Sequence, residues 1–167
     1  TPAPRWRECL LWIGLSASAS ILLLAITRHL TQDVAPVPFL WVVPLSIYLL
    51  SFILCFDAPR YYVRGWFLAA LPLAFLALDR VLDGGMGVPL LITLLSVSLF
   101  VFCMVCHGEL AKQQPSSENL TLYYLMLSVG GFLGGFFVGV VAPYGFDSNY
   151  ELSVGIVLSA VVMHLQR

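Results

Sequence analysis

Long apolar segments recur along this chain, and each is close to the length of a helix that spans a bilayer. An α-helix needs about 20 residues to cross about 30 Å of hydrocarbon. Of the 167 residues, 60% are hydrophobic and only 10% are charged, whereas a water-soluble domain has about 25% charged residues. Such a composition cannot cover a surface that faces water. The sequence therefore predicts that these side chains face lipid or one another.

The apolar residues occupy every face of these segments without alternation, which favours helices over strands. Lipid also requires each backbone polar group to pair internally, and a helix achieves this alone. We therefore predict an all-α fold, a polytopic membrane helix bundle with about six transmembrane helices in one domain over residues 1–167. Since the chain opens with Thr1, we expect a segment of a longer polypeptide. The predicted spans are residues 6–28, 38–57, 63–82, 88–110, 119–142 and 150–165.

Lysine and arginine in short loops indicate the orientation of such a bundle, because they favour the cytoplasmic side. With six spans, both ends of the chain lie on one side. That side carries Arg5, Arg7, Arg60, Arg64, Lys112 and Arg167, and the other carries Arg28 and Arg80. We therefore predict that both termini are cytoplasmic. All four cysteines fall toward the same side, where thiols stay reduced.

The fifth predicted span carries glycines at four-residue spacing, Gly131, Gly135 and Gly139. Residues four apart lie on one face of a helix, so these glycines form a smooth stripe. Small residues let two membrane helices approach closely. The first span has a similar stripe at Gly14 and Ser18. We predict that the two stripes pack together, with a homodimer or another subunit as the alternative partner.

A cluster of polar residues follows the first span on the predicted outer side. Its members are Arg28, His29, Gln32 and Asp33. A charge in hydrocarbon costs about 2.5–3.5 kcal/mol at a helix centre, which favours a mutual pair between Arg28 and Asp33. The same groups could instead bind a small molecule or an ion, or dock a partner. We regard this cluster as the first candidate for a binding site.

A second set of candidate binding residues comprises His107 and Glu109, at the end of the fourth span, and Glu151, at the start of the sixth. Hydrogen bonding at the membrane interface explains the first two, and proton handling or docking is the alternative. The helix dipole stabilises an acid in a first helical turn and explains Glu151.

Residues 103–107 have the Cys-x-x-Cys-His order of a haem c attachment site. The motif lies within an apolar helix on the predicted cytoplasmic side, so we expect neither haem nor another cofactor. No histidine and carboxylate residues have metal-ligand spacing, so we expect no metal site. The 8 basic residues are scattered, which argues against a nucleic-acid partner.

Several strings along the chain form a specific combination. They are LTQDVA at 30–35, PFLWVVPL at 38–45, YLLSF at 48–52, CHGEL at 106–110, LTLYYL at 120–125, GGFLGG at 130–135 and VAP at 141–143. In combination they resemble bacterial spermidine-synthase-like integral membrane proteins. The resemblance covers nearly the whole chain.

This resemblance implies a transporter-like membrane region that is fused, in such proteins, to a soluble domain of the aminopropyltransferase fold. The chain matches the membrane region only, so we expect it to have no catalytic site of its own. The resemblance also implies the bacterial inner membrane. Composition makes the lipid bilayer the expected partner, and the glycine stripe allows other membrane subunits or a second copy. Three alternatives remain: a transporter-like domain for small amines or other solutes, a structural subunit of an energy-transducing or photosynthetic membrane complex, and an integral membrane enzyme whose active site would need the absent soluble domain.

Overall fold

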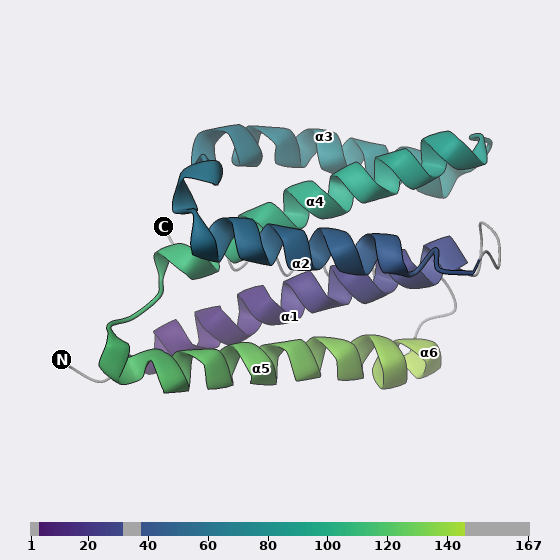
Figure 1. Ribbon diagram of the computed structural model, residues 1–167. Helices are drawn as coiled ribbons and strands as arrows, with labels where there is room; N and C mark the ends of the chain where they lie inside the picture. Colours follow the sequence, from purple (N-terminus) through teal and green to yellow (C-terminus); the bar gives the residue numbers. More distant parts are fainter. Residues whose placement is uncertain (1–3, 32–37, 146–167) are drawn as a thin grey trace. The chain divides into compact units, whose positions relative to one another are not determined.

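The computed structural model describes residues 4–31 and 38–145, and within these ranges the chain is helical and has no β-strand (Figure 1). The predicted all-α class is therefore confirmed for the described residues. The elements are α1 (Trp6–His29), α2 (Val42–Asp57), η2 (Pro59–Tyr61), α3 (Arg64–Asp83), α4 (Val88–Lys112), η3 (Ser117–Asn119), α5 (Leu120–Phe136), η4 (Phe137–Val141) and α6 (Ala142–Gly145).

The chain divides into two compact units. Unit 1 combines Thr1–Ala25 with Glu109–Arg167, and unit 2 is the continuous segment Ile26–Gly108. Unit 1 therefore contains most of α1 together with α5, whereas unit 2 contains α2, α3 and most of α4.

Among the described residues, three helical segments are long and apolar enough to cross a membrane. They are α1 with 24 residues, α4 with 25, and the continuous run Ser117–Tyr144 with 28. The apolar helix α2 is shorter, at 16 residues, and α3 has 20 residues but bears charges near both ends. Helices of this length and composition are typical of membrane proteins. The predicted span at 150–165 lies outside the described residues.

The ends of α1 carry charges that suit the helix dipole. At its start, the Arg5 backbone N–H donates to Glu8 Oε2 at 3.0 Å, as in a capping box. Its last turn holds Arg28 and His29, where a positive charge is favourable. These charges stabilise the two ends of α1.

The helix in the second predicted span begins at Val42, four residues later than the sequence predicted. Residues 38–41 form a turn instead, and Phe39 adopts a positive φ of 69° that is unfavourable in a helix. Pro44 thus lies in the first turn of α2, where its missing N–H removes no intrahelical hydrogen bond.

In unit 1, α1 and α5 lie side by side and run in the same direction (Figure 1). The rings of Trp12 and Tyr123 meet edge to face with centroids 5.0 Å apart. One turn further along both helices, Ser16 Oγ donates to the Leu127 carbonyl at 2.7 Å. The contacting positions advance together in the two helices, so the pair is parallel.

Two glycines of α5 lie directly against the backbone of α1. A Cβ atom on Gly130 would lie 2.5 Å from the Ile13 carbonyl oxygen, and one on Gly134 would lie 2.6 Å from that of Ala17. Real Cβ atoms do not approach backbone oxygens this closely, so only glycine permits this helix separation.

The predicted glycine stripe lies beside this line of closest approach. A Cβ on Gly131 would be 3.5 Å from Ser20 Oγ, and one on Gly135 would be 3.7 Å from Leu24, which are ordinary van der Waals distances. A Cβ on Gly139 would meet nothing within 4 Å. The first and fifth predicted spans thus do pack together, although the tightest contacts are at Gly130 and Gly134.

In unit 2, α3 packs against α4. Ser98 Oγ donates to the Ala74 carbonyl at 3.4 Å, and Phe75 and Phe102 meet edge to face with centroids 5.2 Å apart. Edge-to-face pairs of this kind contribute about 0.5–1.5 kcal/mol beyond the burial of their surface. These contacts help to hold α4 in place beside α3.

Replacing Gly134 with Leu should destabilise the protein by about 1–3 kcal/mol, because the new side chain must push α1 away from α5. The matched control is Gly139→Leu, which enters open space on the same helical run and should cost much less. Titration of the purified protein from mild detergent into denaturing detergent measures both changes. Equal losses for the two variants would contradict the described packing.

Candidate functional site

The most buried polar contact of unit 2 joins α2 to α4. Ser51 Oγ lies 2.9 Å from His107 Nδ1, and both side chains are 1% exposed or less. An ionisable side chain inside a membrane helix is costly and is a candidate functional residue for that reason. We therefore take His107 as the centre of the candidate site.

The Ser51 hydroxyl joins His107 to the backbone of α2. Its oxygen lies 2.8 Å from the Tyr48 carbonyl oxygen and 2.9 Å from His107 Nδ1. A hydroxyl has one hydrogen to donate, so it either donates to the Tyr48 carbonyl and accepts from Nδ1–H, or donates to Nδ1 of the other tautomer. Both arrangements leave a hydrogen bond between Ser51 and His107.

Aromatic side chains of α2 flank the imidazole. Tyr48 and Phe52 each meet the His107 ring edge to face, with centroids 4.8 Å and 5.2 Å away. Phe52 also stacks on Phe56 with centroids 4.3 Å apart. This aromatic surround keeps water from the ring and strengthens the hydrogen bond to Ser51.

A second contact between α2 and α4 lies one turn from the imidazole. Cys55 Sγ is 3.7 Å from both the carbonyl oxygen and the sulfur of Met104. Cys103 and Cys106 are buried in α4 and form no disulfide within the described residues. Among the described residues, no three His, Cys, Asp or Glu side chains are grouped so that they could hold a metal ion.

Gly108 lets the connection between α2 and α3 pack onto α4. The ring of the buried Tyr62 occupies the space that a Cβ on Gly108 would need. Tyr62 also contacts Phe67 of α3, with ring centroids 5.6 Å apart. The Cys-His-Gly string at 106–108 therefore supplies both the buried imidazole and the gap beside it.

The cluster predicted after the first span is only partly described. Arg28 and His29 are the last residues of α1, and both are half-buried. Gln32 and Asp33 lie outside the described residues, as does Glu151. The expected pair between Arg28 and Asp33 therefore stays a prediction.

Glu109 belongs to unit 1, where it is buried near the end of α4. Its Oε1 atom is 3.9 Å from Lys112 Nζ, and the lysine side chain is half-exposed. A cation in the last turn of a helix also suits the helix dipole. The geometry is that of an ion pair at the end of a helix.

The end of α4 is also held by a hydrogen bond from α5. Tyr123 donates its hydroxyl to the Leu110 carbonyl at 2.8 Å, and the same carbonyl accepts the backbone N–H of Gln113 at 3.0 Å. Trp12 packs edge to face on the same tyrosine. Its Nε1 atom is buried and has no hydrogen-bond partner in the part of the chain that the structure describes.

His107 was predicted from the sequence as a candidate site residue, whereas the residues around it were not. Ser51, Tyr48 and Phe52 lie more than 50 residues away along the chain, and no local pattern links them to His107. The sequence offered one indication of Ser51, because it is a hydroxyl residue in a segment that is otherwise almost wholly apolar.

We compared the chain with protein-family models, curated proteins and solved structures. No protein-family model matches the chain, and no curated protein or solved structure is significantly similar to it. The resemblance to spermidine-synthase-like membrane proteins therefore depends on the sequence strings alone.

Replacing Ser51 with Ala should destabilise the protein by about 0.6–1.7 kcal/mol, the range measured for hydrogen bonds between membrane helices. The loss follows because the buried His107 Nδ1 atom loses its hydrogen-bond partner. Ser46→Ala is the matched control, since Ser46 is exposed on the same helix. Unfolding in denaturing detergent measures both variants, and a Ser51→Ala protein as stable as the control would contradict the assigned hydrogen bond.

Proposed function

We propose that this chain is a multi-pass helical module of the bacterial inner membrane, with no catalytic site of its own. It serves as the membrane region of a spermidine-synthase-like protein, crosses the bilayer six times and has both termini in the cytoplasm. The observation that carries the proposal is the parallel packing of α1 and α5.

Parallel packing limits how often the chain crosses between these two helices. If α1 and α5 both span in the same direction, the segment between them must cross an odd number of times. The helix α4 is long and apolar enough to supply one crossing. It follows that α2 and α3 either both cross or both stay on one side.

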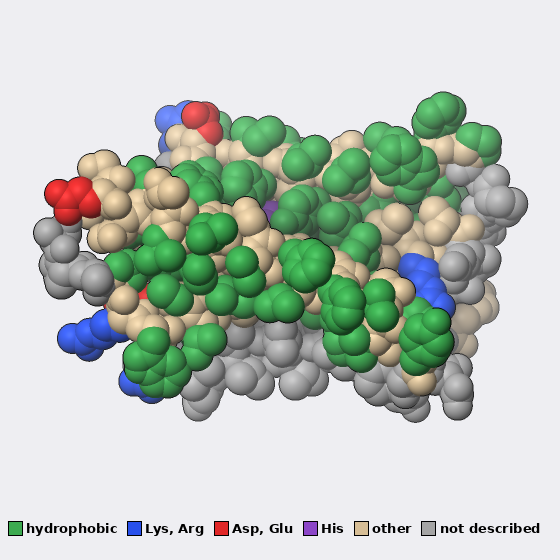
Figure 2. All heavy atoms as spheres, turned by 90° about the horizontal axis from the view of Figure 1, so that it is seen from below, with side chains coloured by type: hydrophobic (Ala, Val, Ile, Leu, Met, Phe, Trp, Pro, Cys, Tyr) green, Lys and Arg blue, Asp and Glu red, His purple; other side chains and the backbone are tan. Residues whose placement is uncertain are grey.

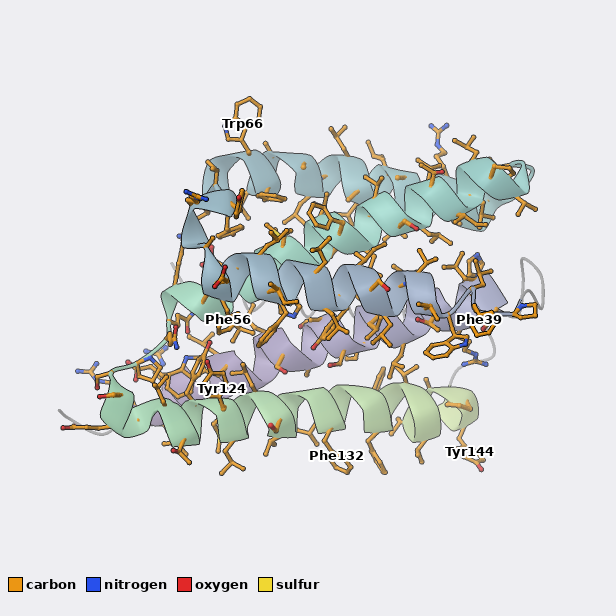
Figure 3. All side chains as sticks on the ribbon, viewed as in Figure 1. Phe39, Phe56, Trp66, Tyr124, Phe132 and Tyr144 are labelled. Carbon is orange, nitrogen blue, oxygen red and sulfur yellow. The ribbon has the colours of Figure 1, made fainter. Side chains whose placement is uncertain are left out.

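The outward face of α5 supports its exposure to lipid. Leu125, Phe132, Leu133 and Phe136 are all exposed, and Figure 3 shows Phe132 pointing away from α1. On the face drawn in Figure 2, hydrophobic side chains cover the central part and charged ones lie toward the ends of the helices. Hydrocarbon is the solvent that suits such a surface.

The strings behind the family resemblance coincide with the tightest packing. Gly130 and Gly134 belong to the GGFLGG string, and His107 and Gly108 belong to CHGEL. Each of these residues makes a contact that a different side chain would disrupt. This coincidence supports the use of the resemblance to propose the family.

Transport of small amines or other solutes is the second candidate function. The buried imidazole of His107 favours it, because ionisable residues within membrane helices often mark ion or proton pathways. The imidazole could take up a proton during a transport cycle.

Cysteine labelling tests the six-span topology. In a Cys9→Ser background, we expect Tyr61→Cys and Glu118→Cys to react only from the cytoplasm, and Asp83→Cys only from outside. The other native cysteines are buried and should stay silent. Positions 118 and 83 keep their sides whether or not α2 and α3 cross, so they are internal controls. Labelling of Tyr61→Cys from outside would contradict six spans and leave four.

An uptake assay tests the second candidate. In proteoliposomes with an imposed pH gradient, His107→Asn should lower the initial uptake of putrescine or spermidine by roughly 100-fold, as loss of a proton-transfer group does. Ser46→Ala should transport at the normal rate. Equal rates with and without the imidazole, or no uptake by the unaltered protein, would contradict a transport role for these solutes.

A further inference from the structure

The connection between α2 and α3 presents aromatic and basic side chains together at the surface of unit 2. Tyr61 is 50% exposed and Trp66 is 80% exposed, and Figure 3 shows Trp66 pointing away from α3. Arg60 and Arg64 are exposed beside them in sequence. We call the surface of these four residues the interfacial patch.

The charge at the two ends of α2 differs. From residue 38 to residue 66, the charged residues are Asp57, Arg60 and Arg64, which leaves a net positive charge at the end that holds the interfacial patch. The other end of α2 carries exposed aromatic residues, Phe39 and Trp41, but no charge. Only one end of this helix is therefore suited to an anion.

Packing holds the interfacial patch in place. The buried Tyr62 fits against Gly108, which anchors the chain between Tyr61 and Arg64. The guanidinium of Arg60 lies over the Tyr61 ring, 5.2 Å from its centroid. Arg60 and Tyr61 thus form one basic and aromatic pair, and Arg64 and Trp66 follow as exposed residues in the first turn of α3.

We propose that the interfacial patch binds the phosphate headgroups of anionic phospholipids. Tyr and Trp rings are enriched at the level of lipid headgroups, and arginine matches the geometry of phosphate oxygens. Each basic residue near an anionic membrane surface contributes about a fivefold enrichment of such lipids. The proposal depends on the proposed membrane placement of unit 2 and adds the lipid class that it recognises.

Fluorescence quenching tests the proposal on the protein in phosphatidylcholine vesicles. The probes are brominated phosphatidylglycerol and brominated phosphatidylcholine, each at the same low mole fraction. Subtraction of the Trp66→Phe protein isolates the signal of Trp66. We expect stronger quenching by the brominated anionic lipid, and Arg60→Gln and Arg64→Gln should each lower the preference about fivefold.

The Arg80→Gln variant is the matched control, because Arg80 is an exposed arginine at the opposite end of α3, and it should keep the full preference. Equal quenching by the two lipids, or a preference that survives both arginine substitutions, would overturn the proposal and leave the membrane placement intact. No quenching by either lipid would overturn the proposal and also contradict the placement of this connection at the bilayer.

Discussion

The close backbone contact between α1 and α5 is the constraint that determines the packing of unit 1 and the possible number of membrane crossings. Lipid chains are as apolar as leucine, so membrane helices associate through close packing and hydrogen bonds. Gly130 and Gly134 remove the side chains that would separate the two helices, and Ser16 adds a hydrogen bond to the Leu127 carbonyl. Because this contact is parallel, it also limits how many times the intervening chain can cross the bilayer.

Unit 2 depends on a different kind of contact. Its helices meet through bulky rings and through the hydrogen bond between Ser51 and His107. Such a buried polar pair adds little stability when it is satisfied, but it is costly when one partner is missing. Register between α2 and α4 is therefore set by a specific donor and acceptor, in contrast to the smooth glycine surface of unit 1.

Composition predicted the helical class well, because charge-poor runs of about 20 residues have few alternatives. Composition does not predict which face of a helix meets its neighbour or which distant residues come into contact. The glycines at 130 and 134 and those at 131 and 135 have the same spacing, and only the rotation of α5 decides which pair meets α1. The partnership of Ser51 with His107 joins distant segments, so no local pattern encodes it. Residues 38–41 form a turn where a helix was predicted, and the positive φ of Phe39 is incompatible with a helix at that position.

The division of the chain into units has a consequence for biosynthesis. Unit 2 is one continuous stretch, so its helices can associate soon after they leave the translocon. The bond from Ser16 to Leu127 instead joins positions 111 residues apart, and contacts of such high contact order form late. In the proposed membrane placement, Ser16 of the nascent α1 therefore has no partner on α5 until Leu127 has been made. This interval is the stage at which insertase or chaperone assistance would matter most.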